Sequence, residues 1–161
     1  MSIIYKENMM DFYGFYTGKI FDAYKYLGAH VEEKGVTFRT FAPSASRITL
    51  IGEFNDWQEW EMNKVSDGNF WECYVPQAKA GQMYKYKIYD RNGNPVDHCD
   101  PYGFGMELRP SSASIIRDMS KYKFKDSQWL QSRSDCRKKP LNIYEIHFGS
   151  FRKPSDKADD W

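Results

Sequence analysis

The chain has 161 residues, enough for one ordinary domain with a short appendage, whereas a complete (β/α)₈ enzyme needs about 250 residues. Its 23 lysine and arginine residues balance 22 aspartate and glutamate residues to a formal charge of +1. No long-range field would therefore recruit nucleic acid or an acidic membrane, and we expect an uncharged or locally recognised partner.

Residues 1–27 form an aromatic, irregular leader that we expect to pack on something else. They lack a basic segment followed by a sustained apolar core, and no later run reaches the ~20 apolar residues of a spanning helix. We therefore expect a cytoplasmic protein that is neither exported nor held in a membrane. Within the leader, Asp22–Leu27 predicts one or two short helical turns, which Gly28 ends.

From Gly35 onward, short apolar runs alternate with turn residues about every ten positions, which is typical of an all-β sandwich. In residues 83–89 the alternation is clear, so Tyr84, Tyr86 and Ile88 should face the core and the residues between them should face solvent. We expect strands at residues 36–41, 47–52, 70–75 and 83–89, and a last short one near 113–117.

The later part of the chain changes character twice. Residues 119–139 are rich in lysine and arginine and have no apolar periodicity, which predicts a connector across a surface. Residues 141–148 then restore a strand pattern, although the sequence offers that strand no partner.

The cysteines and the possible metal ligands indicate neither a disulfide framework nor a metal site. Cys73, Cys99 and Cys136 are widely spaced and form no CxxC pair, which fits reduced thiols in a cytosol. Residues 97–100 include Asp, His and Cys side chains, but adjacent loop residues rarely converge on one ion without a second cluster. We expect no metal and no cofactor.

Five motifs in order resemble bacterial 1,4-α-glucan (glycogen) branching enzymes of glycoside hydrolase family 13. They are Tyr26–His30, Gly52–Trp57, Asp100–Gly103, Glu107–Pro110 and Ile143–Phe151. The similarity runs from about residue 11 to the C-terminus.

The resemblance implies a mainly β chain built around an immunoglobulin-like β-sandwich of the early set. It places a carbohydrate-binding module of family 48 at residues 28–118, after the leader at 1–27 and before the connector at 119–139. Residues 140–161 would be the first strand of a truncated (β/α)₈ catalytic barrel. The expected partners are an α-1,4-glucan such as glycogen and the missing barrel of the same polypeptide.

Enzymes of this family transfer α-1,4-linked glucan chains to α-1,6 branch points in glycogen biosynthesis. Their catalytic carboxyl groups lie on later barrel strands, and retaining transfer needs two such groups about 5 Å apart on a rigid scaffold. We therefore expect no catalytic residue in this chain and no activity from the chain alone.

Three residues are predicted to contact glucan. Trp57 follows a strand in a polar loop, where its indole could stack on a sugar ring, and the resemblance places it and Lys85 at sugar-binding positions. Asn55 would help to fix orientation. Binding relatives have a second tryptophan near residues 92–96, which this chain lacks, so Trp60 is considered as a second ring.

Two nearby residues have simpler interpretations. Trp71 lies within a predicted strand and should be in the core, and His30 is expected to make a structural hydrogen bond.

Alternative functions stay open at this point. The chain could be a stand-alone glycogen-targeting module or the N-terminal module of an isoamylase-type debranching enzyme. An immunoglobulin-like interaction domain with no sugar ligand would be favoured if Trp57 were buried.

Overall fold

A computed structural model describes residues 9–120, 122–136 and 139–147. The chain divides into two compact units, residues 1–121 and 122–161. No helix in the described ranges is long and apolar enough to cross a membrane. The domain boundaries expected from the sequence, at 28–118 and 119–139, stay predictions.

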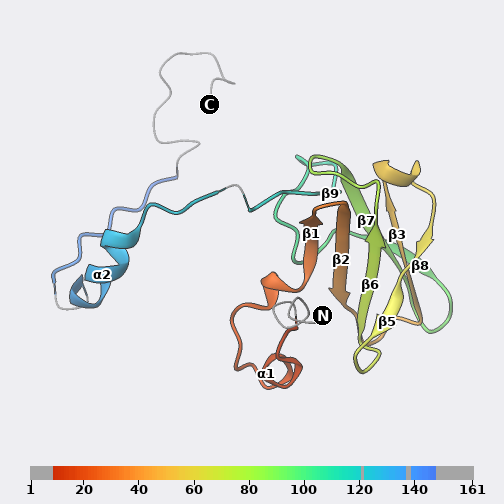
Figure 1. Ribbon diagram of the computed structural model, residues 1–161, viewed down its shortest axis with the longest axis horizontal. Coiled ribbons are helices and arrows are strands. Elements are labelled where there is room, and N and C mark those ends of the chain that lie inside the picture. Colours follow the sequence, from red (N-terminus) through yellow and green to blue (C-terminus); the bar gives the residue numbers. More distant parts are fainter. Residues whose placement is uncertain (1–8, 121, 137–138, 148–161) are drawn as a thin grey trace, which may run out of the picture. The chain divides into compact units, whose positions relative to one another are not determined.

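The first unit contains two antiparallel sheets (Figure 1). Sheet A has the strand order β1-β2-β6-β5, and sheet B has the order β4-β3-β7-β8, with β9 pairing with β7. This arrangement confirms the predicted mainly β sandwich. The strands are β1 (Gly28–Glu32), β2 (Gly35–Phe41), β3 (Arg47–Gly52), β4 (Trp60–Glu61), β5 (Asn63–Val65), β6 (Phe70–Val75), β7 (Met83–Tyr89), β8 (Pro95–His98) and β9 (Ser114–Ile115).

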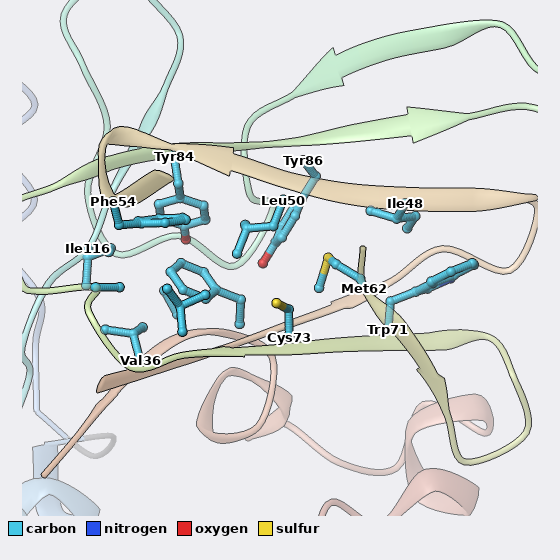
Figure 2. Packing of buried hydrophobic residues seen from close by; sticks show 14 residues of the cluster. Val36, Ile48, Leu50, Phe54, Met62, Trp71, Cys73, Tyr84, Tyr86 and Ile116 are labelled. Atoms are coloured by element: carbon cyan, nitrogen blue, oxygen red, sulfur yellow. The ribbon is translucent and has the colours of Figure 1, made fainter. Parts of the chain in front are cut away.

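The main hydrophobic core lies between the two sheets (Figure 2). The Phe38 ring, fully buried, packs 4.9 Å from that of Tyr84 and 5.4 Å from that of Phe54, measured between ring centroids. Trp71 is buried in the same cluster and donates its indole N–H to the Ala42 carbonyl, which confirms it as a core residue. The alternating pattern of β7 places Tyr84 and Tyr86 inward, as predicted.

The leader covers the outer face of sheet A. Its elements are the helix α1 (Phe12–Tyr16) and a 3₁₀ turn, η1 (Ala23–Lys25), which matches the short turn expected before Gly28. Phe70, on the opposite side of β6 from Trp71, is buried in a second apolar cluster with Met10 and Leu27. The leader thus packs on the sandwich itself and covers the outer face of sheet A around Phe41, Val65 and Phe70.

Gly28 shows why the leader must end where it does. Its φ of +103° is a left-handed conformation that favours glycine, and a Cβ there would lie 2.8 Å from the Tyr102 carbonyl oxygen. The start of β1 is therefore pressed against the loop that contains Tyr102. His30, two residues later, has its Nε2 atom 3.0 Å from the Leu27 carbonyl, which confirms its structural hydrogen bond.

A buried carboxylate anchors the same loop to the core. The Tyr84 and Tyr86 hydroxyls donate to Asp100 Oδ2 at 2.6 and 3.1 Å, and the Asp100 amide donates to Ser114 Oγ at 2.8 Å. Burial raises the pKa of Asp100 above its usual value, although the tyrosine hydrogen bonds oppose that rise. This cluster ties β7 and β9 to the connection between β8 and β9.

The second unit differs from the sequence expectation. Residues 122–136 include a helix, α2 (Ser127–Cys136), where only an irregular connector was predicted. Its described side chains are solvent-exposed and form no apolar stripe, which explains why the pattern gave no helical signal.

The expected barrel strand is not formed within residues 141–147. Leu141 and Ile143 are 77% and 88% exposed, and a strand without a neighbouring strand has nowhere to place its backbone hydrogen bonds. Residues 148–161 lie outside the described part of the chain. The assignment of 140–161 to a barrel stays a prediction.

Candidate functional site

The outer face of sheet B carries the residues predicted to bind. Because paired residues in antiparallel strands share a face, the register sets Lys85 beside Ile51, Lys87 beside Thr49 and Tyr89 beside Arg47. Tyr84 and Tyr86 point into the core, so these three pairs face the other way. They form one row along β3 and β7.

The loop after β3 is built around the Asn55 side chain. Its amide nitrogen donates to the Leu50 carbonyl at 3.2 Å and to the Gln58 carbonyl at 2.7 Å, while its oxygen accepts from the Gly52 N–H at 2.9 Å. Asn55 is buried, 9% exposed. Both the nitrogen and the oxygen of its amide therefore hold the loop. Asn55 thus positions the loop, and its side chain is not a free polar group for a ligand.

Asn55 sets up an unusual backbone in the next two residues. Asp56 and Trp57 have φ values of 52° and 59°, in the left-handed region that few non-glycine residues adopt. The Trp57 N–H donates to the Gly52 carbonyl at 2.9 Å, which closes the loop. Such strain persists only where the surroundings impose it, and it is concentrated at functional sites.

Trp57 is displayed at the surface by this loop. Its side chain is 41% exposed and belongs to neither apolar cluster. Among the described residues, its indole makes no hydrogen bond or ring contact of the kinds found for Trp71 and Trp60. An indole held in this way has an apolar face available for stacking.

Lys85 is close to Trp57 in the topology of the sheet. It pairs with Ile51, the residue just before Gly52, so both predicted contact residues lie toward the end of sheet B where β3 finishes. Within the described ranges, the Lys85 ammonium group has no side-chain hydrogen bond or ion pair, so its donors are open to a ligand. The structure brings Trp57 and Lys85 to one end of one sheet.

Trp60 does not supply a second ring. It pairs with Leu50 in the register of β3 and β4, which turns it to the inner face of sheet B. There it packs partly buried against the main core, with its ring 6.5 Å from that of Phe54. The suggestion that Trp60 joins the binding surface is therefore wrong, because strand alternation turns it inward.

Sequence reasoning missed a polar network beside the predicted site. The Glu59 carboxylate accepts from the Tyr89 hydroxyl at 2.7 Å, from Lys87 Nζ at 3.1 Å and from Thr49 Oγ1 at 3.1 Å. Arg47 Nη2 lies 3.4 Å from the same carboxylate. The Tyr89 hydrogen bond, with help from Lys87 and Thr49, lowers the pKa of Glu59, so the group remains an ionised acceptor.

Arg47 extends this network to its edge. Its guanidinium donates to the Glu61 carboxylate and lies 4.6 Å from the centre of the Tyr89 ring. The Glu61 hydrogen bond raises the pKa of Arg47, and the Glu59 hydrogen bond raises that of Lys87. The network contains two cations and two anions, so its local charge is balanced.

The described residues were also considered for a metal site and for a cavity. No group of three His, Cys, Asp or Glu side chains there could hold a metal ion, and Asp100 of the 97–100 segment is turned into the core. A mainly apolar hollow of about 310 Å³ lies at the far end of sheet B, beside the loop 42–45 and the β7–β8 hairpin. Among the described residues it shares only Tyr89 with the polar network.

Comparison with known proteins identifies the module and its relatives. Residues 26–103 match the family described as carbohydrate-binding module 48 (isoamylase N-terminal domain). The chain is similar to a 1,4-alpha-glucan branching enzyme GlgB of Fusobacterium nucleatum, with 38% identity over 157 residues covering 96% of this chain and 26% of the relative. A GlgB of Dechloromonas aromatica is 39% identical, covering 92% of this chain and 25% of its own length.

The chain spans about a quarter of the length of these curated relatives. Among solved structures, the apo pullulanase of Klebsiella pneumoniae aligns with a TM-score of 0.51 and 24% identity, over 65% of this chain and 12% of that one. At this identity the likeness shows the fold alone. It agrees with the β-sandwich of residues 28–115.

Proposed function

The chain carries a carbohydrate-binding module of family 48, and on that basis we propose that it is the glucan-handling N-terminal part of a glycogen branching enzyme. Its role is to hold an α-1,4-glucan while catalytic residues elsewhere in the polypeptide transfer chains to α-1,6 branch points. The chain itself supplies binding and not catalysis. Its buried Cys73 and half-buried Cys99 are free thiols, which supports a cytoplasmic location.

The length of chain over which the sequences are similar supports this proposal. The branching-enzyme match covers 96% of the chain, whereas the module model ends at residue 103. The similarity therefore extends beyond the sandwich into segments that a stand-alone module would not need. This favours a part of a branching enzyme over a free glycogen-targeting module.

We assign the first contact with glucan to Trp57 and Lys85. The exposed indole of Trp57 offers an apolar face to a pyranose ring, and the Lys85 ammonium group offers donors to its hydroxyls. Asn55 contributes by holding the loop that displays Trp57. The exposure of Trp57 disfavours an interaction domain without a sugar ligand.

Affinity electrophoresis in a glycogen-containing native gel tests the assignment. We expect the chain to be retarded, and Trp57→Ala to lose most of that retardation because one ring contact contributes about 1 kcal/mol. Phe21→Ala is the matched control, since Phe21 is an aromatic residue of the leader that is 92% exposed. Equal retardation of the parent and Trp57→Ala would show that glucan binds elsewhere.

A further inference from the structure

The Glu59 network lies on the same outer face of sheet B as Lys85, and Glu59 follows Trp57 in the sequence. Glu59 comes two residues after Trp57, and its carboxylate is fixed by side chains from β3 and β7. Exposed ion pairs of this kind contribute little to folding. Folding stability alone therefore does not account for this network.

The network continues the row that begins at Lys85. From Lys85 through Lys87 to Tyr89, the side chains on this face advance four residues along β7, which is about 14 Å at the rise of a β-strand. A single sugar ring on Trp57 and Lys85 would occupy only the first part of that length. The remaining part is lined by Lys87, Glu59 and Tyr89.

The hydrogen-bonding groups of this second part suit a neutral polyhydroxyl ligand. The Lys87 ammonium group has three donors, of which one is used on Glu59. The Glu59 carboxylate has about four acceptor positions, of which Thr49, Lys87 and Tyr89 use three. The Tyr89 oxygen can still accept a hydrogen bond after donating its own proton. Donors and acceptors thus alternate over a short distance, as they do on a sugar.

The charge balance argues against an ionic ligand. Arg47 and Lys87 are matched by Glu59 and Glu61. A phosphate would lose to the two carboxylates most of what it gained from the two cations. A glucose unit has no net charge and can use both kinds of group.

We propose that Glu59, Lys87 and Tyr89 form a second glucose subsite that continues the Trp57 site along the outer face of sheet B. This inference rests on the proposed function. It makes the bound glucan run along β7, so an oligomer longer than the Trp57–Lys85 contact gains affinity. Glu59 then has two roles, as acceptor for a sugar hydroxyl and as the group that positions Lys87.

The test compares glucose, whose single ring can fill only the Trp57–Lys85 contact, with maltotriose as ligands of the 161-residue chain in NMR titrations. We expect maltotriose to bind at least about fivefold more tightly, the worth of one additional hydrogen bond. Glu59→Gln and Lys87→Met should remove that advantage and leave the dissociation constant for glucose unchanged. Glu72→Gln, which breaks the Arg39 ion pair on sheet A, is the control and should keep the advantage.

The contrary outcomes distinguish failure of the second subsite from failure of the proposed function. Equal affinities for the two ligands in the parent chain, or an undiminished advantage in both variants, would overturn the second subsite alone. Weakening of both ligands to the same degree by Glu59→Gln would show that Glu59 only supports the Trp57 loop, which also overturns the subsite. Failure of the parent chain to bind either ligand would overturn the proposed function itself.

Discussion

The Tyr84 hydroxyl donates a 2.6 Å hydrogen bond to the carboxylate of Asp100 inside the sandwich. Both side chains are almost fully buried, so the carboxylate has exchanged water for protein donors. Desolvation nevertheless dominates and raises the pKa of Asp100. A folded-state pKa above the unfolded value means that this group favours folding most in acid, and that the favourable contribution is lost as the pH rises through the folded pKa.

Tyr84→Phe should destabilise the chain at neutral pH by about 2 kcal/mol, because it leaves a buried charge with one donor fewer. The loss should shrink in acid, where Asp100 becomes protonated and needs its donors less. Urea unfolding at pH 7 and at pH 4 measures both values. Tyr74→Phe is the control, since its exposed hydroxyl donates only to the Lys34 carbonyl, and an equal loss in the two variants would contradict the expectation.

Alkaline pH should unfold the sandwich through its buried tyrosines. Burial raises the pKa of Tyr84 and of Tyr86 well above the usual value, with Asp100 adding to the rise. Each phenol therefore stays neutral in the fold but ionises in the unfolded chain above about pH 10, which costs about 1.4 kcal/mol per pH unit.

Stability measured by chemical unfolding between pH 9 and 12 tests that dependence. Tyr86→Phe should lower the steepness of the decline, because one buried phenol no longer titrates. Tyr13→Phe should leave it unchanged, since Tyr13 is 71% exposed in the folded chain. A decline of the same steepness in Tyr86→Phe and the parent would be inconsistent with this origin.

Much of the sandwich could be predicted from the sequence because its central strands have simple patterns. The ranges 47–52, 70–75 and 83–89 agree with β3, β6 and β7, which place one row of apolar side chains in the core. The strands β1, β4, β5 and β8 were missed. They are short and lie at sheet edges, and β4, β5 and β8 have no buried position, so the alternation of buried and exposed residues is weak or absent.

The candidate site was also predicted only in part. Local sequence sufficed to single out Trp57, but the hydrogen bond between Tyr89 and Glu59 joins residues 30 positions apart. The pair comes together because β4, which Glu59 directly precedes, pairs with β3, and β3 pairs with β7. The outward alternation of Lys87 and Tyr89 was the one signal that could have indicated their shared face.

The leader should stabilise the sandwich even though it adds no strand. The Phe15 ring lies 5.0 Å from that of Phe41 and 5.4 Å from that of Phe70, between centroids. Phe15→Ala should therefore cost about 3 kcal/mol in the free energy of unfolding. Tyr13→Ala on the same helix is the control, and it should stay within about 0.5 kcal/mol of the parent because its side chain faces solvent.

Asn55→Ala should weaken both the fold and glucan binding through a single loop. The substitution leaves the Gly52 N–H and the Leu50 and Gln58 carbonyls without the partners that Asn55 provides. Unsatisfied groups of this kind cost about 1 to 3 kcal/mol each, less where water can reach them. Because the loop also holds Trp57 in its left-handed conformation, its loosening should reduce glycogen retardation.

Two comparisons separate the positioning role of Asn55 from direct contact with the sugar. Asn55→Asp keeps an acceptor for the Gly52 N–H but loses both donors, so its stability and binding should lie between those of the parent and Asn55→Ala. Asn69→Ala, in the exposed turn before β6, removes an amide of the same kind far from the loop and should leave binding unchanged. If Asn55→Ala kept full stability yet lost all retardation, the side chain would be a direct ligand of the glucan, and its hydrogen bonds to the loop would be incidental.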